Sequence, residues 1–207
     1  INRLTRAGLK VAICEQVEDP SQSKGIVKRE VIRVITPGTT LEEELLVRGK
    51  NNYLAAVHRM GQVYGLAFID LSTGDFRVTE LLSSEELGSE LIRITPSECL
   101  YPENLGINLE NIKPSSVSSI VFTPLENWSF DYDLNSDLLK KHFGVSTLDG
   151  FGCQQLIPGI SAAGAVLQYI NTNLRSSLRH VCALNLYYPS QFMSMDAVSQ
   201  AYLEVID

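Results

Sequence analysis

The sequence predicts an α/β protein with a mixed sheet flanked by helices, preceded by a fragment of a second α/β domain. Three observations lead to this fold class. Short β-branched segments joined by tight turns predict neighbouring antiparallel strands. Helical patterns and further short strands follow them along the chain. The charge also reverses near residue 36: residues 1–36 carry seven Lys and Arg against four Asp and Glu, net +3, whereas residues 37–207 carry ten against twenty, net −10.

The basic front piece is predicted to be a helix end followed by two strands. Its elements are a helix end at residues 1–7 closed by Gly8, a strand at Lys10–Glu15, a turn-rich loop at 19–25 and a strand at Ile26–Thr36. Pro37-Gly38 then breaks the chain, and residues 37–50 are expected to form an acidic linker with one helical turn at Leu41–Leu46. A domain boundary is therefore predicted here.

The acidic body is predicted to open with three antiparallel strands and a capped helix. The strands are Tyr53–Arg59, Val63–Leu71 and Asp75–Leu81. Ser83 and Glu86 form a capping-box pattern for a helix through Ile94. The later elements are strands at Glu98–Tyr101 and Ser118–Thr123, helices at Leu134–Phe143 and Ile157–Leu174, extended chain at His180–Tyr188 and a final helix at Met195–Ile206.

Composition limits the classes of function. A net charge of −7 argues against DNA binding by the whole chain, because phosphate contacts need Lys and Arg, so only the basic front piece is expected near nucleic acid. No apolar run approaches the roughly 20 residues of a membrane helix, so no membrane association is expected. The four cysteines are far apart and lack metal-ligand spacing, which predicts buried, reduced thiols in a cytoplasmic protein and no metal: Cys14, Cys99, Cys153 and Cys182.

The front piece carries VAICEQVEDP (Val11–Pro20) and VKREVIRVITPGT (Val27–Thr39). This pair of motifs at this separation is a specific signal, and the chain resembles the MutS family from end to end. The body resembles the connector domain of that family in four motifs: FIDLSTGDF (Phe68–Phe76), ITPSECLYPE (Ile94–Glu103), FGVSTLDGFG (Phe143–Gly152) and AAGAVLQYI (Ala162–Ile170). Near the end this chain reads QAYLE (Gln200–Glu204) where the family usually has Arg-Asn-Leu-Glu.

The resemblance implies a division of the chain. Residues 1–36 would be the C-terminal part of the mismatch-binding domain and 37–50 a linker. Residues 51–179 would be the connector domain, with a ribonuclease H-like fold, and 180–207 the start of the helical core domain. A full-length protein of this kind is expected to be a homodimer that binds mispaired double-stranded DNA, uses ATP with magnesium to start mismatch repair, and recruits MutL.

The two motifs that carry those activities in the family are absent from this chain. It contains no Phe-x-Glu, the family's mismatch reader, and no Gly-x-x-x-x-Gly-Lys-Ser/Thr loop for ATP phosphates. The chain is therefore expected to be a non-catalytic connector without a cofactor of its own, which links the mismatch-binding and ATPase parts and helps to dock MutL.

Two sets of candidate site residues accompany this expectation. Lys28, Arg29 and Arg33 on the second strand are expected to contact the DNA backbone, with an ordinary solvated strand face as the alternative. The resemblance also implies a surface for MutL. Asp137, Lys140 and Lys141, on the exposed side of the Leu134–His142 helix, are assigned to that surface, and plain solvated surface is again the alternative.

A metal-dependent, ribonuclease H-like nuclease is the alternative function. Asp70 ends a predicted strand as the first carboxylate of such an enzyme would, and Glu90 and Asp149 are the other carboxylates that a two-metal site could use. A turn-capping role is the favoured interpretation of Asp70, and a fold alone does not confer activity. The aromatic residues, including Trp128, are expected in the core.

Overall fold

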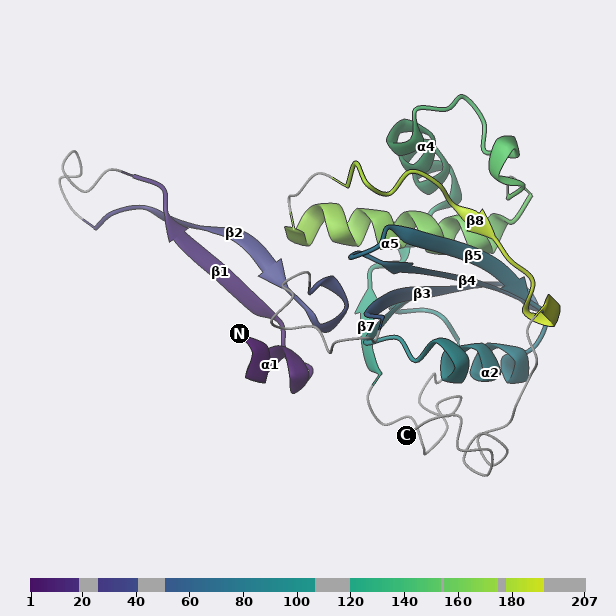
Figure 1. Ribbon diagram of the computed structural model, residues 1–207, viewed down its shortest axis with the longest axis horizontal. Helices are drawn as coiled ribbons and strands as arrows, with labels where there is room; N and C mark the ends of the chain where they lie inside the picture. The colour runs from purple at the N-terminus through teal and green to yellow at the C-terminus, as the bar shows by residue number, and fades with distance from the viewer. Residues whose placement is uncertain (19–25, 41–50, 107–119, 154, 175–177, 192–207) are drawn as a thin grey trace.

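The computed structural model describes residues 1–18, 26–40, 51–106, 120–153, 155–174 and 178–191. Within these residues a two-stranded antiparallel sheet projects from a six-stranded mixed sheet that is covered by helices on both faces (Figure 1). The predicted mixed α/β class is therefore confirmed. The predicted loop at 19–25, the helical turn at Leu41–Leu46 and the final helix at Met195–Ile206 lie outside the described residues.

The front piece consists of a short helix and a β-ladder. Helix α1 spans Asn2–Arg6, and strands β1 (Val11–Gln16) and β2 (Arg29–Ile35) pair antiparallel. The predicted second strand is three residues too long at its start. Lys28 still accepts a hydrogen bond from the Val17 amide at 3.0 Å, but regular pairing begins at Arg29.

The body is built on a central sheet with the order β7-β6-β3-β4-β5-β8. Strands β3, β4 and β5 form an antiparallel meander, whereas β6, β7 and β8 join by parallel pairing. The strands are β3 Tyr53–Met60, β4 Val63–Asp70, β5 Asp75–Leu81, β6 Glu98–Pro102, β7 Val121–Leu125 and β8 Asn185–Leu186. The predicted meander is correct because short turns force adjacent strands to pair: two residues, with Gly61 at φ +64°, join β3 to β4, and residues 71–74 join β4 to β5.

Among the described residues, helices cover both faces of this sheet. Helix α2 (Ser84–Ile94) packs on one face and α5 (Ile157–Leu174) on the other, and α4 (Tyr132–Phe143) packs chiefly against α5 (Figure 1). Each face has its own cluster of buried apolar side chains. The predicted α5 agrees with the structure at both ends, since its apolar residues repeat at helical spacing on a helix that is buried for most of its length.

The predicted cap of α2 is present in a slightly different form. The Ser83 hydroxyl accepts from the Glu86 amide at 3.2 Å, as a capping box requires. The Glu86 carboxylate, however, accepts from the amide of Leu82 at 2.8 Å rather than from that of Ser83. Helix α4 begins two residues earlier than predicted, because Asp131 is its N-cap and accepts from the Leu134 amide at 3.0 Å.

Four short 3₁₀ helices complete the described elements: η1 Pro37–Thr39, η2 Asn127–Phe130, η3 Asp149–Phe151 and η4 Pro189–Gln191. The expectation of a buried Trp128 is wrong, since its side chain is 55% exposed. The turn of η2 directs Phe130 into the core instead, and the indole N–H of Trp128 donates to Glu126 on the surface. Within the described part of the chain, no helix is long and apolar enough to cross a membrane.

The segment after α5 stays with the sheet. Of the predicted extended chain at His180–Tyr188, only β8 forms a ladder, yet Val181, Leu184 and Tyr187 are all buried against the body. A domain boundary was predicted after residue 179, but the chain stays packed against the sheet at least as far as Tyr187. The cause is the parallel pairing of β8 with β5, which local sequence does not reveal.

Candidate functional site at a buried junction

The three basic residues predicted for DNA contact do not share one face of the ladder. The register places Ile13 opposite Arg33 but Cys14 opposite Val31, so one residue of β2 is extra and forms a β-bulge. Cross-strand partners share a face. Arg29 therefore lies on the more exposed face with Cys14.

Lys28 and Arg33 lie on the opposite face of the ladder, together with Glu30. The Lys28 ammonium pairs with the Glu30 carboxylate at 2.6 Å. The hydrogen bond and charge of Glu30 raise the pKa of Lys28, which stays protonated. Arg29 is exposed on the face that carries Cys14, whereas on the opposite face Lys28 is exposed and Arg33 is partly buried.

The residues predicted for a partner surface do lie on the outside of α4. Asp137 and Lys141 are exposed, and Lys140 forms an ion pair with Asp137 at 3.1 Å. The opposite side of the helix carries Leu139, which is fully buried. Helix α4 ends at Gly144, whose φ of +67° is a left-handed cap. The amphipathic helix thus presents these three charges to solvent.

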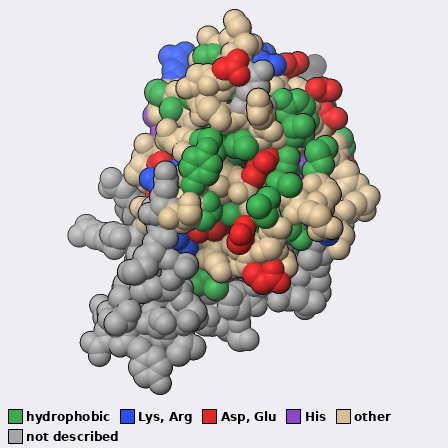
Figure 2. Space-filling model, turned by 90° about the vertical axis from the view of Figure 1, so that its right-hand side faces the viewer, with side chains coloured by type: hydrophobic (Ala, Val, Ile, Leu, Met, Phe, Trp, Pro, Cys, Tyr) green, Lys and Arg blue, Asp and Glu red, His purple; other side chains and the backbone are tan. Residues whose placement is uncertain are grey.

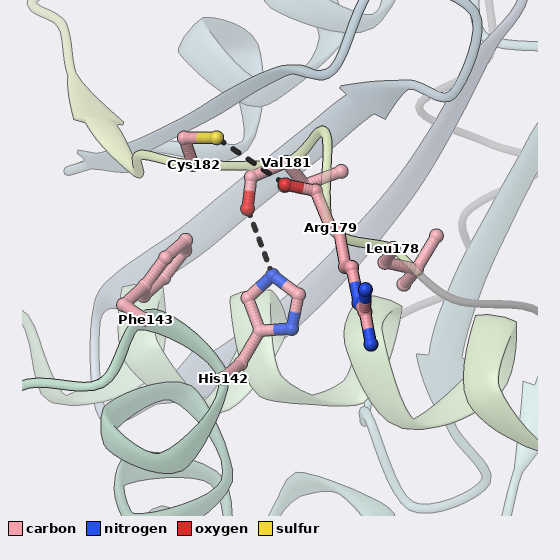
Figure 3. A pocket seen from close by; sticks show the side chains of 6 residues that line it. All are labelled: His142, Phe143, Leu178, Arg179, Val181 and Cys182. Carbon is pink, nitrogen blue, oxygen red and sulfur yellow. Dashed lines mark hydrogen bonds between the residues drawn. The ribbon is translucent and has the colours of Figure 1, made fainter.

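A recess of about 380 Å³ adjoins the end of α4 (Figure 3). It is lined by residues of α4 and of the segment after α5: His142, Phe143, Leu178, Arg179, Val181 and Cys182. One ring nitrogen of His142, Nε2, is hydrogen-bonded to the Val181 carbonyl at 2.9 Å. This bond ties the C-terminal end of α4 to the segment that leaves α5.

The three carboxylates of the nuclease alternative do not converge. The Asp70 carboxylate accepts from the Ser72 amide at 2.8 Å and its hydroxyl at 2.6 Å, which is the turn role favoured from the sequence. Glu90 is bound by Arg93 and Tyr187, and Asp149 lies in η3 beside the other face of the sheet. Across the described residues, no group of three His, Cys, Asp or Glu side chains could hold a metal ion. The arrangement does not support a nuclease.

The most elaborate polar site is a junction around Glu98, a fully buried residue at the start of β6. Its carboxylate accepts four hydrogen bonds. Two come from the corner where β2 runs into η1: the Thr36 hydroxyl and, at 3.1 Å, the Gly38 amide, both to Oε2. Two come from the body itself: Thr123 of β7 at 2.7 Å and Tyr169 of α5 at 2.8 Å, both to Oε1.

These four donors account for the burial of the acid. An unpaired carboxylate in a protein interior is very unfavourable, but one that accepts several hydrogen bonds is tolerated. Burial and the neighbouring Glu98 charge raise the pKa of the Tyr169 phenol far above its usual range, so it remains a donor. Glu98 thus joins the corner, a strand and a helix at one point.

Asn52 makes a second connection at the same corner. Its side-chain amide donates to the Pro37 carbonyl at 3.1 Å and to the Thr40 carbonyl at 3.4 Å. Its own carbonyl accepts from the Ser97 hydroxyl, one residue before Glu98. The first residues of the predicted linker, 37–40, are therefore packed into the body rather than solvated.

A second buried acid holds the segment that follows α5. Glu90 of α2 accepts from the Tyr187 hydroxyl at 2.8 Å and pairs with Arg93 at 2.7 Å. The Arg93 guanidinium also lies over the Tyr187 ring, 5.5 Å from its centroid. Burial and the Glu90 charge raise the pKa of Tyr187, which keeps the hydroxyl protonated as a donor. The body thus binds both the chain that precedes it and the chain that follows β8.

Sequence reasoning missed both glutamates as structural centres. Glu98 was placed in a predicted strand without a role of its own, and Glu90 appeared only as a possible metal ligand. An acid inside an apolar strand segment is the signal that could have indicated a site at Glu98, because such a group requires donors. Nothing local identifies the donors, which lie 60 and 71 residues away at Gly38 and Tyr169.

The cysteines divide into two pairs. Cys99 and Cys153 are buried as expected, and burial raises the pKa of Cys153 to about 11. Cys14 and Cys182 are exposed, so the expectation of four buried thiols is wrong for these two. Cys14 points outward from the free face of a ladder, and Cys182 lies at the rim of the recess beside α4.

One end of the body presents mainly apolar and acidic side chains (Figure 2). Figure 2 shows the right-hand face of Figure 1, where β5 ends. Apolar and acidic side chains are mixed over it, and the Lys and Arg side chains in view lie towards its margins. Exposed apolar residues of this end include Met60 and Leu82. The projecting ladder with its basic residues is on the opposite side of the molecule (Figure 1).

The fold is a mixed α/β domain to which a preceding antiparallel ladder is joined at a buried junction. The family model for MutS domain II matches residues 52–181, and that for MutS domain I matches residues 1–44. The chain belongs to the MutS family.

Relatives over the full chain carry the description DNA mismatch repair protein MutS. The protein of Protochlamydia amoebophila is 40% identical over 207 residues, which cover 99% of this chain and 24% of the relative. That of Syntrophobacter fumaroxidans is 43% identical over 207 residues, covering 99% and 23%. That of Lachnoclostridium phytofermentans is 39% identical over 210 residues, covering 100% and 22%. The chain thus spans about a quarter of the length of these relatives.

Proposed function

We propose that this chain is the connector of a full-length mismatch repair protein, and that it transmits the position of the mismatch-binding part to the core. The observation that carries this proposal is the pair of buried acids. Glu98 fastens the preceding unit to the sheet, and Glu90 fastens Tyr187 of the following segment. A domain held at both ends by satisfied buried groups is suited to pass on movement rather than absorb it.

The proposal includes the ribonuclease H-like fold and the division of the chain given above. Strands β3, β4 and β5 form an antiparallel meander, and β6 and β7 extend the sheet beside β3 by parallel pairing. This arrangement of strands supports that fold assignment. Residues 1–36 would be the end of the mismatch-binding domain, 37–50 the linker, 51–179 the connector and 180–207 the start of the core. The packing of residues 37–40 and 181–187 against the sheet supports limits of the connector that lie somewhat outside these numbers.

The activities of the full-length protein are proposed with it: binding of mispaired DNA as a homodimer, ATP use with magnesium, and recruitment of MutL, in the cytoplasm. The similarity to DNA mismatch repair proteins supports a role in mismatch repair. In this scheme the 207 residues have no catalytic activity of their own and hold no cofactor. Neither a Phe-x-Glu motif nor a phosphate-binding loop occurs in them.

The DNA-contact part of this proposal is tested by a salt titration of the chain on paired and mispaired duplexes. We expect weak binding that is equal for both, because the mismatch-reading motif is not in this chain. Changing Arg29 to Ala should flatten the dependence of log K on log salt by about 0.9, the value of one phosphate contact. Lys28→Ala should change it less, since that charge is already paired with Glu30.

Lys141→Ala is the matched control, because it removes one exposed positive charge from α4, away from the ladder. If Lys141→Ala and Arg29→Ala flatten the salt dependence equally, binding follows net charge and the ladder has no special role. A preference for the mispaired duplex would contradict the assignment of mismatch reading to residues outside this chain.

The MutL-facing surface is favoured by the exposure of one side of α4. Reversing Asp137, Lys140 and Lys141 together in the full-length protein should weaken MutL recruitment at least about tenfold, since like charges would then face the partner. Mismatch binding and ATP turnover should stay unchanged, because surface substitutions usually alter stability by no more than about 0.5 kcal/mol. Pull-down or biolayer interferometry with MutL on mispaired DNA measures this.

Glu103→Lys serves as the control, a charge reversal at an exposed position in the loop after β6. Equal recruitment by the triple variant and the unchanged protein would place the docking surface away from α4.

A further inference from the structure

We infer that Glu98 is the positioning residue that sets the direction of the β1–β2 ladder relative to the six-stranded sheet. This inference rests on the proposed function for its relevance to DNA, but the geometry it concerns is a property of this chain alone. It deepens the connector proposal by naming the atoms through which the preceding unit is oriented.

The ladder is held only near its base among the described residues. Ile35 is 3% exposed, Val31 further along the strand is 44% exposed, and Ile26 is fully exposed. Helix α5 contacts β2, and the Lys10 ammonium lies 5.5 Å from the centre of the Tyr169 ring. In Figure 1 the ladder accordingly extends away from the sheet. This projecting ladder, formed by strands β1 and β2, is the arm, and the six-stranded sheet with its helices is the body.

An arm of this kind amplifies small rotations at its base. Strand β2 has seven residues, on the order of 20 Å of extended chain. A tilt of about 15° at the base would displace the far end, where Arg29 lies, by about 5 Å. A displacement of this size exceeds the length of a hydrogen bond, so phosphate contacts at Arg29 depend on the angle at the base.

Glu98 is the centre of that base. Its Oε2 atom accepts from Thr36 and Gly38, which belong to the arm side of the corner, and its Oε1 atom accepts from Thr123 and Tyr169 of the body. The two oxygens of a carboxylate lie in one plane at a fixed separation. Through them Glu98 fixes the position of the arm relative to the body. Thr36 itself is fully buried and also bonds Thr39, so the corner is a closed turn rather than a loose chain.

Close packing supports the same conclusion. A methyl group added at Gly38 would lie 2.7 Å from Leu54 Cδ1 and 2.9 Å from the Cβ of Glu98. Glycine thus allows the corner to approach the sheet closely enough for its amide to reach the carboxylate. A larger residue would force Leu54, Glu98 or the corner itself to shift.

The chain offers a matched pair of substitutions for a test. Thr36→Val and Thr123→Val each remove one buried hydroxyl donor from the same carboxylate with nearly no change of shape. The first loosens the arm side, and the second loosens the body side. If Glu98 only stabilises the fold, the two substitutions should change the distance between arm and body equally. If Glu98 positions the arm, only Thr36→Val should change that distance.

The native cysteines supply the probe. Cys14 lies on the arm and Cys182 on the body, and both are exposed, whereas Cys99 and Cys153 are buried with raised pKa values that leave little reactive thiolate. Spin labels on Cys14 and Cys182 of the 207-residue chain allow the distance between arm and body to be measured by double electron–electron resonance. Thermal denaturation of each variant reports stability in parallel.

We expect a narrow distance distribution for the unchanged chain and for Thr123→Val, and a distribution at least about twice as broad, or displaced by several Å, for Thr36→Val and Gly38→Ala. Both Thr→Val variants should lower the melting temperature, Thr36→Val by somewhat more, because its hydroxyl also contacts that of Thr39. Narrow, coincident distributions for all four proteins would overturn the inference, as would equal broadening in both Thr→Val variants. The distance measurement tests only the role of Glu98. The DNA titration tests the proposed function, so the two can fail separately.

Discussion

Replacing Gly65 with alanine is expected to destabilise the protein by about 3 kcal/mol, the upper range for forcing extra atoms into a packed core. The new Cβ would lie 2.1 Å from the backbone C and O atoms of Pro158 and 2.3 Å from the amide nitrogen of Gly159. These are backbone atoms in the first turn of α5, so no side-chain rotation can relieve the overlap. Helix α5 would have to lift from β4, although it is buried for most of its length.

Urea denaturation followed by circular dichroism measures this change. Gly150→Ala is the control: a Cβ there meets nothing within 4 Å, and its backbone is not in the left-handed region. That variant should be within about 0.5 kcal/mol of the unchanged protein. Equal stability of the two alanine variants would mean that α5 is not seated on β4 as described.

Replacing Glu98 with alanine should lower the free energy of unfolding by about 3–5 kcal/mol, because four buried neutral donors lose their shared acceptor. The change leaves the amide of Gly38 without an acceptor and opens a cavity between β6, β7 and α5. The hydroxyls of Thr123 and Tyr169 lose their acceptor as well. Each buried donor left unsatisfied costs about 1–3 kcal/mol.

Glu98→Gln is the informative comparison. An amide keeps one acceptor oxygen for the Gly38 N–H, and the hydroxyls of Thr123 and Tyr169 can turn to accept from its NH₂ group. We therefore expect Glu98→Gln to lower the free energy of unfolding by less than about half as much as Glu98→Ala does. The same urea titration decides it: a glutamine variant as unstable as the alanine variant would show that the negative charge, rather than the hydrogen-bond pattern, holds the junction.

The elements that could be predicted from the sequence are those whose cause is local. Helix α5 was predicted with the bounds it has, because its apolar residues recur with the helical period over 18 residues. The β3–β4–β5 meander followed from short turns that leave neighbouring strands no other way to pair. The exposure of Asp137 and Lys141 on α4 was expected for the same reason, since helical periodicity assigns a solvent side.

The candidate site could be predicted only in part, because its contacts join residues far apart in the chain. Tyr187 meets Glu90 across 97 positions, and Tyr169 meets Glu98 across 71. Trp128 was expected inside on residue type alone, yet the direction of the η2 turn leaves it on the surface. The bulge in β2 likewise separated Arg29 from Arg33, although both lie in one basic strand.

By itself the sequence determined the fold class, the main helices and strands and, through its motifs, the MutS family. These depend on periodicity, turn residues and motif order, which are properties of short stretches of chain. Only the tertiary structure decided that residues 37–40 and 181–187 belong to the body and that Glu98 is the centre of the junction. A buried carboxylate is stable only where donors from several distant segments converge on it, and that convergence exists only in the folded chain.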